Sequence, residues 1–160
     1  MIDEKKEPLK EKLSRARDEL LQWTRTLHES DWTQAVYAHD EVWTVRDVFC
    51  HLIWAEGGMA RLIQHIRQGE EGVPADFDVN RYNARGVRKL QEKPLTELLS
   101  MMTKNRDWIL QILDELSPEE LQLKGRHGTL RIMSIEDVLH MIADHERQHL
   151  GDLRQAVSGA

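Results

Sequence analysis

Residues 44–68 read TVRDVFCHLIWAEGGMARLIQHIRQ, and this stretch decides the fold class. Its apolar side chains recur every three or four residues, which is the spacing of one face of a helix: Val48, Leu52, Ala55, Met59 and Leu62. Thr44 suits the N-cap of this helix, and Asp47 suits the reciprocal partner of a capping box. We therefore predict an amphipathic helix that begins at Thr44 and buries one face.

Other segments of the chain carry the same periodicity. Long helices are predicted at residues 8–28, 94–116 and 134–157. A polar loop at 69–77 and a short helix at 79–90 are expected between the second and third long helices. Four long amphipathic helices with almost no strand signal predict an all-α protein, a four-helix bundle with one short extra helix.

Residues 124–132 are expected to form a loop or at most one short hairpin. No linker, low-complexity tract or shift in composition marks a second unit. We therefore expect a single domain over residues 1–160.

The composition excludes several classes of function. The formal net charge is −6, and basic residues alternate with acidic ones, whereas a general nucleic-acid binder needs a basic face. No apolar stretch is long enough to span a bilayer, and the N-terminus does not resemble a secretory signal. The single cysteine, Cys50, cannot form an internal disulfide, which fits a reducing compartment. We expect a cytoplasmic protein with no nucleic-acid and no membrane partner.

Three histidines form a candidate metal site. His145 and His149 lie four residues apart, so their imidazoles project from one face of a helix and can bind one metal ion. His51 lies within the apolar stripe of residues 44–68, where a polar residue is not expected. Without a partner, His51 would be interpreted as a core histidine bonded to a backbone carbonyl.

The depth of these histidines in their helices supports a shared site. His51 lies seven residues after Thr44, or ~10 Å along the helix axis, and His149 lies ~12 Å before the end of its helix. If the two helices are antiparallel, the imidazoles lie at nearly the same level. If they are parallel, the levels differ by ~12 Å. The spacing favours an antiparallel pair that holds one metal ion through His51, His145 and His149.

The remaining polar residues have two interpretations each. Asp152 and Asp47 can orient the imidazoles, or they can be a solvated charge and a helix cap. Glu56 and Glu146 point away from the positions of ligands. The other histidines fit the site badly, although His127 can approach an open pocket. Trp54 and Met141 are interpreted as core packing that can also line the pocket, and Cys50 as a buried inert thiol. Arginines that can bind an anionic cofactor, or form surface salt bridges, are Arg61, Arg126 and Arg131.

The sequence resembles the DinB/YfiT-like proteins. The resemblance rests on WTVRDVFC at residues 43–50 before His51, on the insert at 77–90, and on HERQH at 145–149. It implies a bundle of up-down-down-up order, which makes the second and fourth long helices antiparallel. It also implies a divalent metal, often nickel or zinc, on His51, His145 and His149. Because several members are homodimers, the resemblance implies a homodimer here.

The donor set indicates an open metal centre. Three imidazoles suit Zn, Ni, Fe or Mn, and three protein ligands leave a position for water or substrate. The resemblance implies a metal-dependent enzyme that transfers a low-molecular-weight thiol, such as bacillithiol or mycothiol, to a small electrophile. Two alternatives remain open at this point: a metal-dependent hydrolase, and a non-catalytic stress-response protein that the metal stabilises.

Overall fold

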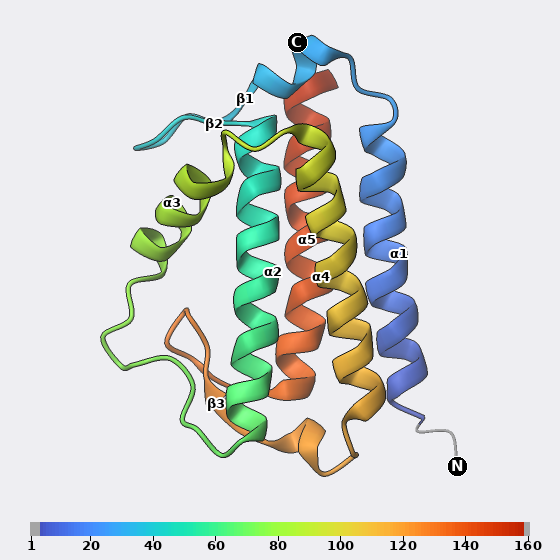
Figure 1. Cartoon of the computed structure of the whole chain (residues 1–160), viewed down its shortest axis with the longest axis vertical. Coiled ribbons are helices and arrows are strands. Elements are labelled where there is room, and N and C mark those ends of the chain that lie inside the picture. The colour runs from blue at the N-terminus through green and yellow to red at the C-terminus, as the bar shows by residue number, and fades with distance from the viewer. Residues whose placement is uncertain (1–3, 159–160) are drawn as a thin grey trace.

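The computed structural model describes residues 4–158, and its long helices form one bundle (Figure 1). The four long helices are α1 (Lys6–Thr24), α2 (Val45–Arg67), α4 (Leu95–Glu115) and α5 (Ile135–Ser158). Helices α1 and α5 run in one direction and α2 and α4 in the other, which confirms the up-down-down-up order. Helix α2 packs against both α4 and α5, and α1 packs against α5 and α4. The antiparallel pair of α2 and α5 is the pair that carries the three histidines.

Short elements cover the ends and one side of the bundle. The predicted extra helix is confirmed as α3 (Val79–Leu90), which packs on α2. Two antiparallel hairpins are present among the described residues: β1 (Ala35–Tyr37) with β2 (Trp43–Thr44), and β3 (Lys124–Arg126) with β4 (Ile132–Ser134). Single 3-10 turns are η1 (Glu29–Thr33) and η2 (Glu120–Gln122). The second hairpin is one of the two forms expected for residues 124–132, whereas the first hairpin was not predicted.

Matching caps fix where α2 and α5 begin. Thr44 accepts a hydrogen bond from the backbone N–H of Asp47, and Asp47 accepts one from the N–H of Thr44 at 2.9 Å, as predicted. Ser134 and Asp137 repeat this arrangement at the start of α5. A reciprocal cap satisfies two N–H groups that a helix start leaves free. The caps thus set the depth of every later residue in these two helices.

A buried layer of charge divides the apolar core into two clusters. One cluster includes Leu13, Ile63 and Ile109, and the other includes Leu20, Phe49 and Leu98. Between them, each long helix contributes one charged side chain that is at most 5% exposed: Arg17, Glu56, Arg106 and Glu146. We call these four residues the charged layer.

In the charged layer each arginine forms ion pairs with both glutamates. Arg17 binds Glu56 at 2.6 Å and Glu146 at 2.7 Å, and Arg106 binds the same two carboxylates at 2.9 Å and 3.3 Å. Each guanidinium also donates to a backbone carbonyl, Arg17 to Met102 and Arg106 to Leu13. Burial opposes the charge of Arg17, but Glu56 and Glu146 together raise its pKa. The layer therefore meets the condition under which buried charge is tolerated, which is complete pairing.

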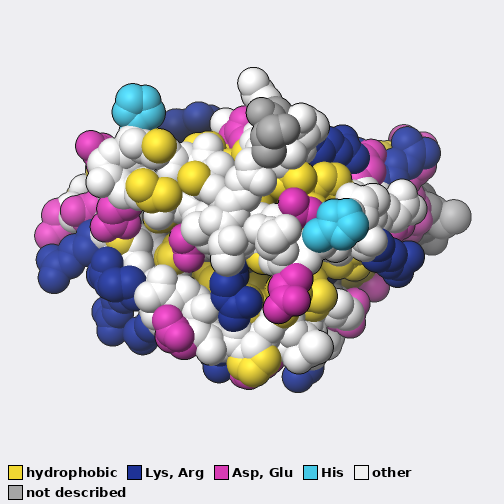
Figure 2. Space-filling model, turned by 90° about the horizontal axis from the view of Figure 1, so that it is seen from above, with side chains coloured by type: hydrophobic (Ala, Val, Ile, Leu, Met, Phe, Trp, Pro, Cys, Tyr) yellow, Lys and Arg dark blue, Asp and Glu magenta, His cyan; other side chains and the backbone are white. Residues whose placement is uncertain are grey.

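The surface carries charges of both signs. Figure 2 looks at the molecule from above and shows acidic, basic and hydrophobic side chains over the same face. Within residues 4–158, no helix combines the length and the apolar character that a membrane crossing requires.

Candidate metal centre

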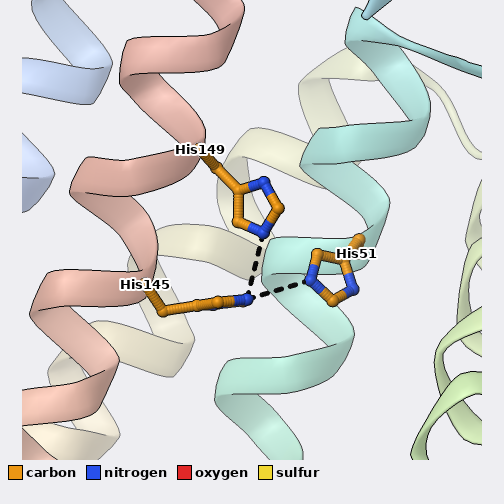
Figure 3. A group of neighbouring side chains, drawn as sticks. All are labelled: His51, His145 and His149. Carbon is orange, nitrogen blue, oxygen red and sulfur yellow. Dashed lines mark hydrogen bonds between the residues drawn. The ribbon is translucent and has the colours of Figure 1, made fainter. Parts of the chain in front are cut away.

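The three predicted histidines meet between α2 and α5 (Figure 3). The Nε2 atom of His145 lies 3.1 Å from Nε2 of His51 and 3.0 Å from Nε2 of His149. Two imidazole nitrogens on one tetrahedral metal with bonds of 2.0–2.1 Å would lie ~3.3 Å apart. The observed separations are a few tenths of an ångström shorter, so a small outward rotation of the rings admits a cation. This cluster could hold a metal ion.

Burial keeps the three imidazoles neutral. Desolvation, followed by the neighbouring His145 and His149, lowers the pKa of His51 to about 3. Desolvation and His149 likewise lower the pKa of His145 to about 4. Desolvation also lowers the pKa of His149, against the opposing effect of Asp152. At neutral pH the rings are therefore uncharged, which is the form that binds a metal.

Tyr37 fixes the tautomer of His149. The Tyr37 hydroxyl donates its one proton to Asp152, so it can only accept from Nδ1 of His149, which lies 2.8 Å away. The proton of His149 is consequently on Nδ1, and the lone pair of Nε2 points to the centre of the cluster. Burial and Asp152 raise the pKa of Tyr37, so the hydroxyl keeps its proton. A carboxylate that orients a ligand histidine through a second group is typical of metal sites.

The three converging Nε2 atoms of the cluster are satisfied better by one metal cation than by a proton shared between the rings. Nε2 of His149 carries no proton, and one proton on Nε2 of His145 can donate to only one of its two neighbours. Three converging lone pairs would be satisfied together by one divalent ion. Nδ1 of His51 is buried and has no hydrogen-bond partner in the part of the chain that the structure describes. The His51 ring packs on the ring of Trp43, with 5.1 Å between the two ring centroids. Packing against Trp43, rather than a hydrogen bond to Nδ1, thus holds the outer side of the His51 ring.

A cavity of about 970 Å³ adjoins the cluster. His51 and His145 form part of its wall, together with residues of α2, α5, the loop before α3 and the β3–β4 hairpin. Many of the side chains that face it are apolar: Ala55, Met59, Leu62, Val73, Phe77, Val79, Met133 and Met141. The volume lies at the upper end of the range for small-molecule pockets. The space beside His51 and His145 is therefore large enough for a small molecule.

The structure separates the other predicted residues by role. Asp152 lies beside the cluster through Tyr37, whereas Asp47 is a helix cap and contacts no histidine of the cluster. Arg61 and Arg131 line the cavity, but Arg126 donates to the carbonyl of Val73 at 3.0 Å and holds the loop before α3 against the hairpin.

The interpretations of the remaining residues can also be compared with the structure. His127 lines the cavity, as does Met141, which also packs against the core. Glu56 and Glu146 lie in the charged layer, outside the histidine cluster. Trp54 packs between α2 and α3, where its ring lies 5.4 Å from that of Tyr82. Cys50 is buried, and burial raises its pKa to about 11, so it is an unreactive thiol.

Tyr37 was not found from the sequence. It lies on β1, outside every periodic segment, and it reaches His149 across 112 positions of the chain. No local pattern links the two residues.

Solved structures share this fold. A crystal structure of the mycothiol-dependent maleylpyruvate isomerase matches with a TM-score of 0.68 at 17% identity, over 91% of this chain. A mutant of the same isomerase matches with a TM-score of 0.72 at 15% identity. The chain spans 60% of the length of the isomerase. An uncharacterized protein from Clostridium difficile 630 matches with a TM-score of 0.68 at 16% identity, over 99% of this chain and 96% of that one.

The sequence itself identifies the family. No curated protein matches it. The family model that describes the DinB superfamily matches residues 12–153, a stretch that contains all three clustered histidines. With the helical bundle of up-down-down-up order and the histidine cluster between α2 and α5, this match shows that the chain belongs to the DinB superfamily.

Proposed function

We propose that the chain is a metal-dependent enzyme that transfers a low-molecular-weight thiol to a small electrophile. The observation that carries the proposal is a cluster of three neutral, converging imidazoles, two of which, His51 and His145, form part of the wall of a cavity of about 970 Å³. A structural metal site is normally closed by four protein ligands, whereas a catalytic site keeps a position open to substrate. The similarity of the fold to a mycothiol-dependent isomerase adds support for a thiol as the co-substrate.

The residues that would hold the metal are His51, His145 and His149, and nickel or zinc suits this donor set. A bound divalent ion would lower the pKa of a thiol that coordinates it, so that the thiol loses its proton near neutral pH. The sulfur would form a bond to the electrophilic carbon. With a chlorinated substrate the C–Cl bond would break, chloride would leave with its electrons, and the thiol proton would pass to solvent; with an epoxide the C–O bond would break and the oxygen would take up a proton.

The protein side chains orient and enclose the reactants. Tyr37 and Asp152 hold His149 with its lone pair directed inward. The apolar wall, which includes Met59, Phe77 and Met141, would displace water from around the reacting sulfur once the reactants fill the cavity. Exclusion of water strengthens electrostatic interactions inside the pocket and suppresses competing hydrolysis. The cavity is large enough for a thiol and an electrophile together.

Metal analysis tests the site. Protein purified without an affinity tag is expected to contain one equivalent of nickel or zinc, and His51→Ala should lose it. His65→Ala is the matched control, because His65 lines the same cavity but is 53% exposed and pairs with Glu70. Metal that is retained in His51→Ala would refute the ligand assignment.

Product analysis tests the reaction. Metal-loaded protein should conjugate a chlorinated or epoxide substrate with bacillithiol or mycothiol, and His145→Ala should not. Turnover of the same substrate to an alcohol without thiol would instead identify a hydrolase. If neither product forms and His145→Ala only lowers the melting temperature, the metal is structural and the proposal of an enzyme fails.

A further inference from the structure

His127 is a buried histidine that the proposed reaction does not yet use. It begins the turn of the β3–β4 hairpin, where its backbone N–H donates to the carbonyl of Arg131 at 2.9 Å and its carbonyl accepts from Leu130 at 2.8 Å. Its side chain is 8% exposed and forms part of the cavity wall, together with His51 and His145. The hairpin thus holds the ring in place against the cavity.

The hydrogen bonds of the turn define the tautomer of His127. The backbone N–H of Thr129 donates to Nδ1 of His127 at 3.2 Å. A backbone N–H is always a donor, so Nδ1 carries no proton and the proton of the neutral ring is on Nε2. Both side-chain hydrogen bonds of His127 within residues 4–158 are made by Nδ1, so the N–H of Nε2 is available to a molecule in the cavity.

The charges that line the cavity complement this donor. Asp144 is paired with Lys12 at 2.8 Å, and Asp137 is bonded to the backbone of Ser134 as a helix cap. By contrast, Arg61 and Arg131 also line the cavity, and neither forms an ion pair within residues 4–158, although Arg61 donates to the hydroxyl of Tyr82 at 3.3 Å. The cavity therefore offers a ligand two guanidinium groups that no carboxylate of residues 4–158 binds.

We propose that the cavity binds a small organic carboxylate, with its anionic group on Nε2–H of His127 and near Arg131, and its apolar part against Met59, Phe77 and Met141. This inference rests on the proposed function and names a feature of its substrates: one of the two reactants carries a carboxylate. An imidazole N–H without an acceptor and guanidinium groups without a carboxylate partner can donate to a ligand, and a carboxylate is acceptor-only. The apolar walls exclude a small, fully hydrated anion as the preferred ligand.

A binding experiment without turnover tests the carboxylate subsite. The probes are 1-naphthoate and its neutral analogue 1-naphthalenemethanol, titrated calorimetrically into metal-loaded and into chelator-treated protein. We expect the carboxylate to bind roughly 10- to 100-fold more tightly than the alcohol, which is the effect of hydrogen bonds to a charged group. This preference should persist without metal. It should fall to near unity in His127→Leu and be largely retained in His127→Gln, which keeps an N–H donor.

Matched variants keep the result interpretable. His65→Leu changes an exposed histidine of the same cavity and should leave the preference unchanged. Arg131→Gln, at an exposed position, should reduce it and guards against a folding defect in His127→Leu. A preference that disappears with the metal but survives in His127→Leu would show that the metal holds the anion, which overturns the proposal. If the proposed thiol transfer does not occur, the protein should still prefer 1-naphthoate to the alcohol. Failure of the proposed reaction can therefore be told apart from failure of the carboxylate subsite.

A competition arm identifies which reactant supplies the carboxylate. Bacillithiol carries carboxylates. If it displaces 1-naphthoate from wild-type protein, but does not displace the weaker binding of 1-naphthoate that remains in His127→Leu, the subsite holds the thiol. If bacillithiol and 1-naphthoate bind together, the subsite holds the electrophile. Equal binding of the acid and the alcohol to wild-type protein would refute the carboxylate subsite outright.

Discussion

Replacing Glu56 by glutamine removes one negative charge from the charged layer and should destabilise the protein strongly. Glu56 accepts from Arg17 at 2.6 Å and from Arg106 at 2.9 Å, and its side chain is 5% exposed. The layer contains two arginines and two glutamates, so the substitution leaves both arginines to share Glu146 and gives the layer one net positive charge. Arginine does not lose its proton in proteins, so the protein cannot relieve this charge by titration.

The expected loss follows from this uncompensated charge. Breaking a buried ion pair by removing one partner costs about 3–5 kcal/mol. For a chain of this size each kcal/mol lowers Tm by roughly 2–4 °C, so a Tm decrease of about 6–20 °C is expected. Urea unfolding followed by circular dichroism measures the change, with the m value as a check that the unfolded state is unaltered.

An exposed ion pair supplies the control. Glu11 binds Arg15 on α1, and both side chains are more than 60% exposed. Because solvent screens such a pair, Glu11→Gln should change the stability by less than the error of the measurement. If Glu56→Gln were as stable as Glu11→Gln, the charged layer would not be fully paired and dry, and the reasoning above would be wrong.

Three further predictions concern the site and the packing of α3. Tyr37→Phe should lower metal affinity ~10- to 100-fold, measured by competition with a chelator, because the ligand histidine loses the group that fixes its tautomer; unchanged affinity would remove Tyr37 from the site. Gly86→Ala should cost about 1–3 kcal/mol, because its Cβ would lie 2.1 Å from the ring of Trp54. Gly151→Ala, where no atom lies within 4 Å of the added Cβ, should instead stabilise the helix by up to ~1 kcal/mol; equal melting temperatures for the two variants would contradict the packing of α3. Metal-free protein should lose stability as the pH falls below 6.5. In the folded protein the pKa values of His51 and His145 are lowered to about 3 and about 4, so these rings stay neutral. In the unfolded chain the same histidines take up protons below pH 6.5, which favours unfolding. The slope should reach ~1.4 kcal/mol per pH unit for each of them, and a flat profile in urea titrations between pH 7 and 5 would show that these rings are not buried in their neutral form.

The sequence predicts the bundle because each long helix buries a continuous face. That burial imposes a period near 3.6 on the apolar residues, and capping residues such as Thr44 mark the start. The histidine cluster could be predicted for the same reason, since depth in an antiparallel pair is a matter of counting residues. In contrast, α1 ends at Thr24 rather than near residue 28, because the last apolar residues belong to the following turns. Helix ends depend on contacts that periodicity does not contain.

Contacts made by irregular segments were not predictable in this way. Tyr37 reaches the site from a strand of three residues whose position depends on the whole end of the bundle. The tautomer of His127 likewise depends on a turn in which Leu130 has a positive φ of 71°. Such positions are determined by tertiary packing, for which a single sequence offers no local signal.

The charged layer did leave a signal in the sequence. Arg17 lies on the apolar stripe of its helix, four residues after Leu13 and three before Leu20, and Arg106 lies likewise between Met102 and Ile109. A charge on the buried face is costly alone. Since all four long helices carry one, two of each sign, the pattern predicts that the charges pair inside the bundle. Glu56 and Glu146 were excluded as metal ligands from their position, but this pairing was not inferred.

The charged layer and the histidine cluster are adjacent along the same two helices. Glu146 directly follows His145 on α5, and Glu56 lies five residues after His51 on α2. Apolar side chains tolerate small rotations of a helix, whereas four ion pairs with fixed partners do not, so the layer sets the rotation of α2 and α5 that brings the histidines together. In some proteins buried charged or polar groups select one arrangement of the helices. Glu56→Gln should accordingly weaken metal binding of the folded protein as well as its stability. If its folded fraction bound metal with wild-type affinity, the layer would stabilise the bundle without positioning the site.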